Sequence, residues 1–220
     1  MVTPWHDSSS DWSHTRHRVR SLVHAIAEEL AEFGAVVHIC ARNNKILIDV
    51  WKNGINNTGT NTPKNLIDYT AEDVTTIMGT NFESSYHLCQ LAHPLLKASG
   101  YGSIVFISSI AGLKALPLCS IYGPSKGAMN QLTKNIALEW AKDNIRANTV
   151  APGPVKTLLL DSFVKSGNEA DKAIEAIVSQ APVGRLGDPE DISAMVAFLC
   201  LPAASFITGQ IINVDGGCTI

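Results

Sequence analysis

Two apolar runs with a periodic segment between them give the clearest structural signal in the chain. Residues 103–109 are apolar through the middle without alternation, which is typical of a parallel strand covered on both faces. Residues 145–150 form a second apolar run that ends at a proline-glycine pair, and residues 210–214 predict a last strand. Between the first two runs, apolar side chains recur at helical spacing, at Ala128, Met129, Leu132, Ile136, Leu138 and Trp140. This order of strand, helix and strand predicts a βαβ unit.

Two further helices are indicated by signals at their ends. Residues 70–73 resemble a capping box with aspartate in the glutamate position, and they predict a helix that carries Asn81. Pro94 is expected to end or bend this helix. Pro189 suits the first turn of another helix, which is expected to reach about Cys200.

Composition agrees with one globular domain and excludes several other classes of protein. A length of 220 residues and a hydrophobic content of 45% suit a single sizeable core. The net charge of −3 gives no reason to expect a nucleic-acid partner, and no apolar run approaches the length of a membrane span. The five cysteines are scattered without paired metal spacing. We therefore expect reduced cysteines, no metal site and a cytoplasmic location.

Candidate acid-base chemistry lies between the first two apolar runs. Tyr122 and Lys126 are four residues apart, so they share one face of the predicted helix. Ser109 closes the preceding strand, at the edge where open α/β sheets bind ligands. A free tyrosine has a pKa of about 10, and a fixed cation beside it would lower that pKa toward neutrality. The alternative for the Tyr-Lys pair is a solvated helix face, and for Ser109 a strand-end cap.

These motifs together resemble the short-chain dehydrogenase/reductase family, and in particular its tropinone-reductase-like branch. The resemblance covers about residues 56–220, with a shorter match at residues 24–43. Its landmarks are Asn56-Asn-Thr-Gly59, Asn81, Ser109, Tyr122 with Lys126, Pro152-Gly153 with Thr157, and Val214-Asp-Gly-Gly217. The resemblance implies an α/β fold with a doubly wound, Rossmann-like parallel sheet. Residues 21–220 would form this single domain, behind a flexible tail at residues 1–20.

The family's chemistry implies that a small ketone is reduced to an alcohol with NADP(H). Tyr122 would protonate the carbonyl oxygen, Ser109 would hydrogen-bond it, and Lys126 would lower the tyrosine pKa and hold the nicotinamide ribose. Asn81 would hold a helix kink and a water of the proton relay; its alternative is an amide that bonds only to backbone.

Further residues are implied to bind the cofactor. Arg42 follows the family's second strand, where an arginine favours NADP over NAD. The others are Asn57, Thr58, Gly59, Pro152, Gly153, Val155 and Thr157. Residues 157–181 would cover a substrate that is small and mostly hydrophobic. The resemblance also implies a homo-oligomer.

The amino-terminal third departs from the family's pattern. No glycine precedes Gly34, so the first helix lacks the glycine-rich turn whose amides hold the pyrophosphate. Only thirteen residues, 43–55, replace a helix, a strand, a helix and a strand, whereas one strand-crossover-strand unit needs about 30. We therefore expect a sheet without its first and third strands, and weak dinucleotide binding or none. The alternative function is a catalytically impaired paralogue that acts as an oligomer partner or has no function.

Overall fold

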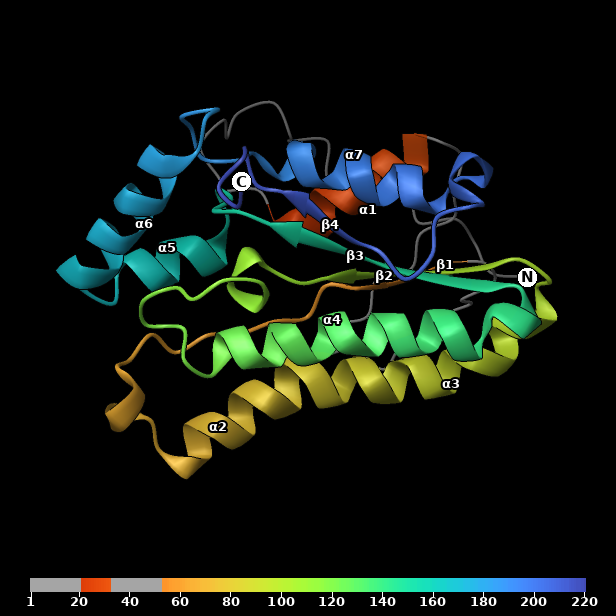
Figure 1. Cartoon of the computed structure of the whole chain (residues 1–220), viewed down its shortest axis with the longest axis horizontal. Helices are drawn as coiled ribbons and strands as arrows, with labels where there is room; N and C mark the ends of the chain where they lie inside the picture. The colour runs from red at the N-terminus through yellow and green to blue at the C-terminus, as the bar shows by residue number, and fades with distance from the viewer. Residues whose placement is uncertain (1–20, 33–52) are drawn as a thin grey trace, which may run out of the picture.

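A parallel sheet with helices on both faces forms the centre of the protein (Figure 1). The computed structural model describes residues 21–32 and 53–220. Within them the strand order is β1-β2-β3-β4 and every pairing is parallel. The strands are β1 (Asn53–Asn56), β2 (Gly102–Ile107), β3 (Ile145–Pro152) and β4 (Ile211–Val214). The register places Ser103 of β2 between Asn53 of β1 and Arg146 of β3.

Helices cover both faces of this sheet, as a doubly wound fold requires. On one face lie α1 (Leu22–Glu32) and α7 (Pro189–Cys200), and on the other lie α3 (Ser84–Ala98) and α4 (Tyr122–Glu139) (Figure 1). A short helix α2 (Ala71–Met78) continues through a π-helical turn η2 (Gly79–Glu83) into α3. The remaining α-helices are α5 (Leu158–Val164) and α6 (Asn168–Gln180).

The core explains why the two central strands are mostly apolar. Every residue of β2 and β3 is buried, so these are central strands, as the apolar runs predict. Along β2 the side chains alternate, so that Val105 packs in the cluster beneath α1 and α7 while Phe106 packs in the cluster with α3 and α4. The buried polar side chains of β3 have partners: Arg146 donates to the Leu199 carbonyl at 2.8 Å and Asn148 donates to the Ile207 carbonyl at 2.8 Å.

Several predicted helix ends are confirmed, one of the two outcomes expected for Pro94 is not seen, and the expectation for Leu138 is wrong. The capping box of α2 is formed, with the Thr70 hydroxyl accepting from the Asp73 amide at 3.2 Å. Pro189 opens α7, and this helix ends at Cys200. Pro94 does not end its helix, because α3 runs through it to Ala98. Leu138 does not join the buried stripe of α4, since its side chain is 82% exposed.

Some expectations for the amino-terminal third fall outside the described residues. These are the tail at residues 1–20, the strand near residues 36–40, and Arg42. Within the described residues, β1 pairs with β2 alone. In the family, the neighbour on its other side would be the first strand.

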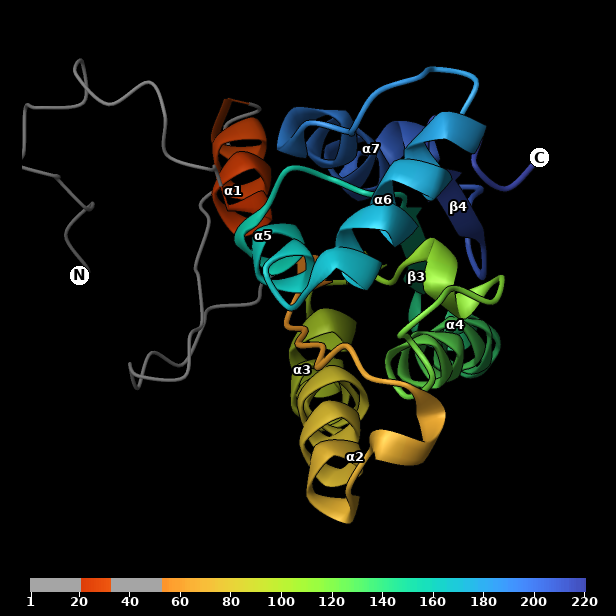
Figure 2. The same cartoon turned by 90° about the vertical axis from the view of Figure 1, so that its left-hand side faces the viewer.

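Residues between β3 and α7 leave the sheet and return to nearly the same point. The Lys156 amide donates to the Gly187 carbonyl at 3.0 Å, and the Gly187 amide donates to the Pro154 carbonyl at 2.9 Å. Helices α5 and α6 lie between these two attachment points, in front of the carboxyl ends of the strands (Figure 2). We call this segment, residues 157–186, the α5–α6 excursion. In the described part of the chain, no helix is long and apolar enough to cross a membrane.

Candidate functional site

A cavity of about 270 Å³ opens at the carboxyl ends of the strands, beneath the α5–α6 excursion. Its walls come from segments far apart in the sequence: the ends of β2 and β3, the start of α4, and the excursion itself. Parallel strands end at one edge of a sheet, and ligands of open α/β folds bind there. The predicted residues Ser109, Tyr122 and Lys126 all line this one cavity.

Ser109 and Tyr122 face the cavity from neighbouring elements. Ser109 follows β2 and begins the short helix η3 (Ile110–Gly112), where its hydroxyl oxygen accepts from the Ala111 amide at 3.1 Å. This bond fixes the oxygen and leaves the hydroxyl proton for another acceptor. Tyr122 is the first residue of α4; burial raises its pKa, and hydrogen bonding with Ser109 offsets part of this rise. Ser109 is therefore a strand-end cap that also contacts the phenol.

Lys126 lies one helical turn after Tyr122 and is buried, with 3% of its surface exposed. Its ammonium nitrogen donates to the Ile107 carbonyl at 2.9 Å and lies 5.6 Å from the centroid of the Tyr122 ring. The two side chains therefore share one face, as the spacing predicts.

The expected lowering of the tyrosine pKa by lysine is not what the protein shows. Burial raises the pKa of Tyr122 to about 12, and the Ser109 hydrogen bond offsets only part of this rise. Burial also lowers the pKa of Lys126 to about 8, because no carboxylate compensates the lost hydration of its ammonium. The physical reason is that desolvation of both groups outweighs their mutual attraction.

Asn81 lies behind the cavity and ties three segments together. It belongs to the π-helical turn η2 and is fully buried. Its side-chain oxygen accepts from the Thr60 amide at 2.8 Å, and its nitrogen donates to the Thr60 carbonyl at 2.9 Å and to the Ser125 hydroxyl at 3.0 Å. The predicted helix distortion is present, and the amide side chain bonds both to the Thr60 backbone and to the Ser125 hydroxyl.

A close approach of η3 to α4 brings Ser109 near Tyr122. A Cβ at Gly112 would lie 2.8 Å from the backbone carbonyl carbon of Lys126. Contacts this short do not occur between real atoms, so only glycine permits the observed spacing. At Gly127, which follows Lys126 at the same interface, a Cβ would stand at an ordinary 3.6 Å from the Gly112 oxygen.

The residues expected to bind the cofactor are mostly gathered at the same cavity. Besides Tyr122 and Lys126, the lining includes Asn57, Gly59, Pro152, Gly153, Val155 and Thr157. Thr58 is exposed and lies outside the lining. Arg42 lies outside the described residues.

The cavity has features that suit a cofactor that bears a phosphate. Ser21 and Leu22, at the start of α1, line it. The amides of a helix start favour an anion. Gly59 lies on the side of Lys126, where a Cβ would stand at an ordinary 3.4 Å from the ammonium nitrogen.

Some cavity residues were not singled out from the sequence, among them Leu116 and Cys119, which belong to no recognisable motif. Ile174 and Ile177 also line the cavity, and they belong to residues 157–181, which are expected from the sequence to cover the substrate. Burial raises the pKa of the Cys119 thiol to about 11, so this group stays neutral.

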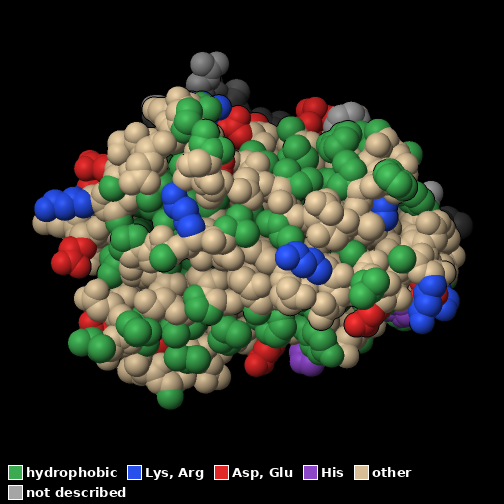
Figure 3. All heavy atoms as spheres, in the orientation of Figure 1, with side chains coloured by type: hydrophobic (Ala, Val, Ile, Leu, Met, Phe, Trp, Pro, Cys, Tyr) green, Lys and Arg blue, Asp and Glu red, His purple; other side chains and the backbone are tan. Residues whose placement is uncertain are grey.

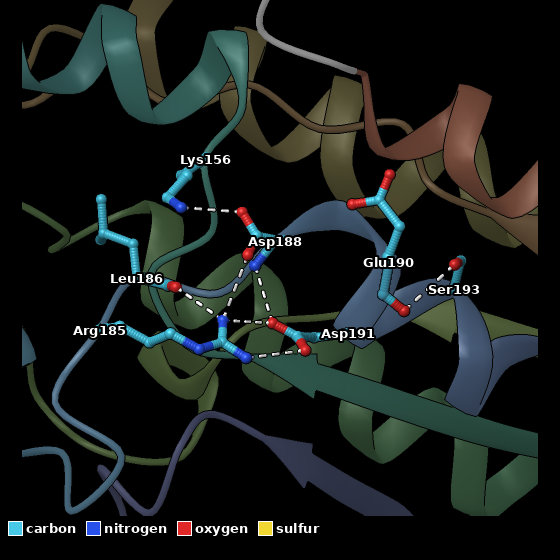
Figure 4. A network of polar contacts seen from close by, with 7 residues as sticks. All are labelled: Lys156, Arg185, Leu186, Asp188, Glu190, Asp191 and Ser193. Carbon is cyan, nitrogen blue, oxygen red and sulfur yellow. Dashed lines mark hydrogen bonds and ion pairs between the residues drawn. The ribbon is translucent and has the colours of Figure 1, made fainter.

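A network of charged side chains holds the base of the α5–α6 excursion (Figure 4). Arg185 contacts Asp191 through both terminal nitrogens, at 2.7 and 3.0 Å, and Lys156 contacts Asp188 at 2.9 Å. Asp191 also accepts from the Asp188 amide at 2.8 Å, which completes the capping box of α7. These contacts fix the return of the chain from the cavity to the sheet. No group of three or more potential metal ligands occurs within residues 21–32 and 53–220.

Comparison with known proteins gives a consistent result. Residues 48–219 match the family model described as enoyl-(acyl carrier protein) reductase. A tropinone reductase homolog of Arabidopsis thaliana is 48% identical, with 91% of this chain and 89% of that protein covered. A tropinone reductase homolog of Datura stramonium is 47% identical, with the same coverage. Both comparisons span 239 positions, more than the 220 residues of this chain, so the relatives contain positions with no counterpart here.

Solved structures share the same architecture. A protein of Thermus thermophilus superposes with a TM-score of 0.81 at 26% identity, covering 91% of this chain and 95% of that one. A protein described as a putative 2-deoxy-d-gluconate 3-dehydrogenase of Agrobacterium tumefaciens was solved with NADP bound. It superposes with a TM-score of 0.69 at 30% identity, covering 76% of this chain and 67% of that one.

Proposed function

Because this chain belongs to the short-chain dehydrogenase/reductase family of oxidoreductases, we propose that it reduces a small ketone to an alcohol with NADPH. The observation that carries the proposal is the convergence of Ser109, Tyr122 and Lys126 on one cavity at the carboxyl ends of the strands. The cofactor, when bound, supplies the hydride. NADP is supported by the solved neighbour that binds it and by Arg42 in the sequence.

Each side chain has a role that follows from its contacts. Tyr122 keeps its proton at neutral pH because burial raises its pKa, so it is the acid that protonates the carbonyl oxygen. Ser109 has its oxygen fixed by the Ala111 amide, and its hydroxyl donates to the same carbonyl oxygen. Lys126 places a positive charge beside the phenol, where it stabilises the phenolate that forms as the proton leaves. Asn81 is a positioning residue.

Substitution of the proposed acid tests this function. For Tyr122→Phe we expect the rate of ketone-dependent NADPH oxidation to fall by about 100- to 10,000-fold, because general acid catalysis contributes factors of this size. The ring and its packing are kept, so the thermal unfolding temperature should change little. Stopped assays with a cyclic ketone and purified protein measure the rate. A Tyr122→Phe variant as active as the parent chain would contradict the assignment.

One observation favours a second candidate, a catalytically impaired paralogue. The relatives have positions with no counterpart in this chain, and within the described residues β1 has no partner on the side where the family's first strand would lie. A protein of this kind would keep the cavity but hold the cofactor poorly. Absence of turnover together with retained folding and assembly would favour this candidate over the reductase.

We also propose that the chain forms a homo-oligomer in the cytoplasm. The outer side of α3 exposes apolar side chains at helical spacing, at Leu88, Leu91 and Leu95. On the face that α4, α7 and β4 present, hydrophobic side chains are interspersed and charged ones are few (Figure 3). Burial of such surfaces against a second copy would remove apolar area from water.

A further inference from the structure

The turn that follows β4, residues 215–218, supports two walls of the cavity that Tyr122 lines. It packs so closely on the end of β3 that a Cβ at Gly153 would lie 3.0 Å from the Asp215 Cα. Just after α6, the Val183 amide donates to the Gly216 carbonyl at 3.2 Å. The 215–218 turn therefore lies against both the end of β3 and the segment that leaves α6.

Lys114 joins this turn to a third element. It lies two residues after the short helix η3 and is partly buried. Its ammonium nitrogen donates to the Cys218 carbonyl at 2.7 Å, a contact between residues 104 positions apart in the sequence. A hydrogen bond with a charged donor is roughly twice as strong as one between neutral groups. The segment after η3 is thus attached to the 215–218 turn by a strong hydrogen bond.

Helix η3 is held in place by contacts other than this bond. The Lys114 amide donates to the Ile110 carbonyl at 3.0 Å. The Asn130 side chain of α4 donates to the Gly112 carbonyl at 3.3 Å, and Gly112 packs directly on the Lys126 backbone. Because η3 is fixed on α4, the element whose position depends on the Lys114 ammonium is the 215–218 turn.

The wall beside this turn is thin. A second cavity, of about 220 Å³, shares the stretch at residues 153–155 with the Tyr122 cavity. Ile177 of α6 lines the Tyr122 cavity, whereas Ala181 and Cys218 line the second one. These three side chains pack with Ile110 of η3 in one buried cluster. Since a cavity on the far side removes packing contacts, the position of this wall depends more strongly on the hydrogen bonds of the turn.

We propose that Lys114 is a positioning residue that holds the α6 wall of the Tyr122 cavity in place through the 215–218 turn. The inference rests on the proposed ketone reductase function and deepens it by assigning Lys114 a role in ketone binding. Loss of the Lys114 bond allows the turn and the adjoining end of α6 to move away from Tyr122. Ser109 and Tyr122 keep their positions, because η3 and α4 remain in contact. Ketone affinity therefore falls, and the rate of the chemical step does not.

Replacement of the Lys114 ammonium tests this role. Methionine has a similar reach but donates no hydrogen bond, so Lys114→Met removes the contact alone. Steady-state rates of the full chain with a cyclic ketone and saturating NADPH give kcat and KM. We expect KM for the ketone to rise about 10-fold while kcat stays within about twofold, because hydrogen bonds to charged groups contribute factors of this size. An unchanged KM, or a loss confined to kcat, would overturn the inference.

Two further lysine variants serve as controls. Lys114→Arg keeps a charged donor and should restore most of the parent affinity for the ketone. Lys142 is exposed in the short helix η4 (Ala141–Asp143), which precedes β3 and so lies at the sheet edge opposite the cavity. Lys142→Met removes the same charge and should leave kcat and KM unchanged. An equal rise of KM in Lys114→Met and Lys142→Met would show that net charge decides, and would contradict the inference.

Gly217 allows an independent perturbation of the same turn. Its φ is +89°, and a Cβ there would lie 2.8 Å from Cδ of Pro182, so alanine must displace the turn or the segment after α6. For Gly217→Ala we expect a similar rise of KM with little change in kcat. Gly100→Ala is the matched control: its φ is +73°, and within the described part of the chain its Cβ would meet no atom within 4 Å. A KM raised no more by Gly217→Ala than by Gly100→Ala would contradict the role of the turn.

Hydrogen exchange separates this inference from the proposed function, because it requires no turnover. In Lys114→Met we expect the amides of α6 to exchange about 10-fold faster than in the parent chain, and those of α4 to exchange at the parent rate. Faster exchange in both helices would indicate general destabilisation and overturn the positioning role. Faster exchange confined to α6 in a chain without turnover would support the role of Lys114 and contradict the reductase. Turnover with α6 exchange and KM both unchanged would support the reductase and overturn the role of Lys114.

Discussion

Single side chains at this site show how burial can reverse an expectation based on charge. Tyr122 and Lys126 are neighbours as their spacing predicts, yet their pKa values move away from those that the pair of charges alone would give. Desolvation penalises the charged form of each group: phenolate for the tyrosine and ammonium for the lysine. The resulting protonation states at pH 7 are a neutral phenol and a cation, which suits donation of a proton to a ketone.

The pH dependence of ketone reduction should follow Lys126 rather than Tyr122. With a pKa of about 12, Tyr122 stays protonated up to strongly alkaline pH. With a pKa of about 8, Lys126 loses its charge as the pH rises through that value. We expect kcat/KM for the ketone to be constant from about pH 6 to 7.5 and to fall about tenfold per unit well above pH 8, since kcat/KM reports ionisation of the free enzyme.

Steady-state rates with saturating NADPH at constant ionic strength measure this profile. A kcat/KM that stays constant to about pH 9.5 would contradict a catalytic requirement for the Lys126 charge. An arginine keeps its charge over this whole pH range, so in the Lys126→Arg variant kcat/KM should not fall above pH 8.

Sequence reasoning identifies the candidate catalytic side chains because their spacing is local, but it misses what depends on contacts between distant segments. Asn81 is found by its motif, whereas its bonds to Thr60 and Ser125 join segments 21 and 44 residues away. The raised pKa of Tyr122 depends on burial, which no local pattern encodes. Cys119 precedes α4 and lines the cavity where it packs in one cluster with Phe163 of α5, 44 residues further along the chain.

Helices and strands are predicted better than their environments. The strands β2, β3 and β4, and the helix starts at Thr70 and Asp188, follow from apolar runs and caps. Pro94 does not end its helix, since a proline within a helix costs one hydrogen bond and α3 continues past it to Ala98. The expectation for Leu138 is wrong because helical periodicity does not show how wide a stripe of the helix surface is packed against the rest of the protein.

The contact of η3 with α4 gives a prediction about positioning. For Gly112→Ala we expect ketone reduction to fall at least about tenfold, because the added methyl would displace η3 from Lys126 and carry Ser109 away from Tyr122. Gly127→Ala is the matched control at the same interface, and its methyl has room. The rate of ketone-dependent NADPH oxidation and the unfolding temperature are measured for both variants. Similar losses in the two variants would contradict the role assigned to close packing at Gly112.

The protein taken as a unit combines the candidate catalytic cavity with an amino-terminal sequence that departs from the family's pattern for cofactor binding. The described sheet contains the family's carboxyl-terminal strands in order, and α1 begins at the cavity. A preorganised set of backbone amides binds pyrophosphate more strongly than flexible cationic side chains do. The departure from the family's pattern should therefore weaken cofactor binding more than it slows the proton-transfer and hydride-transfer step.

Titration with NADPH measures this effect. We expect saturable binding with a Kd of about 100 µM or weaker. NADPH at about 100 times its Kd would then stabilise the fold by about 2.7 kcal/mol, which raises the unfolding temperature. NADH is the control and should bind more weakly if Arg42 contacts the 2′-phosphate. A Kd of about 1 µM would contradict the expected weakness, and no binding at millimolar NADPH would favour the impaired paralogue.

Assembly is tested separately from catalysis. We expect size-exclusion chromatography with light scattering to give a multiple of 23.6 kDa. Leu91 is 72% exposed on α3, so Leu91→Glu should shift the population toward the monomer without unfolding it. A parent chain that is monomeric at micromolar concentration would contradict the proposed homo-oligomer.

The paired attachment points at Gly187 and Lys156 have a consequence for how such a protein can diversify. The backbone enters and leaves the α5–α6 excursion at adjacent positions. Outside the cavity, salt bridges of Asp188 and Asp191 with Lys156 and Arg185 stabilise this point. The length of α5 and α6 and the side chains that they present to the cavity can therefore change while Tyr122, Ser109 and the sheet keep their positions. As a result, the lining of the cavity can be changed by exchanging one continuous segment of the chain.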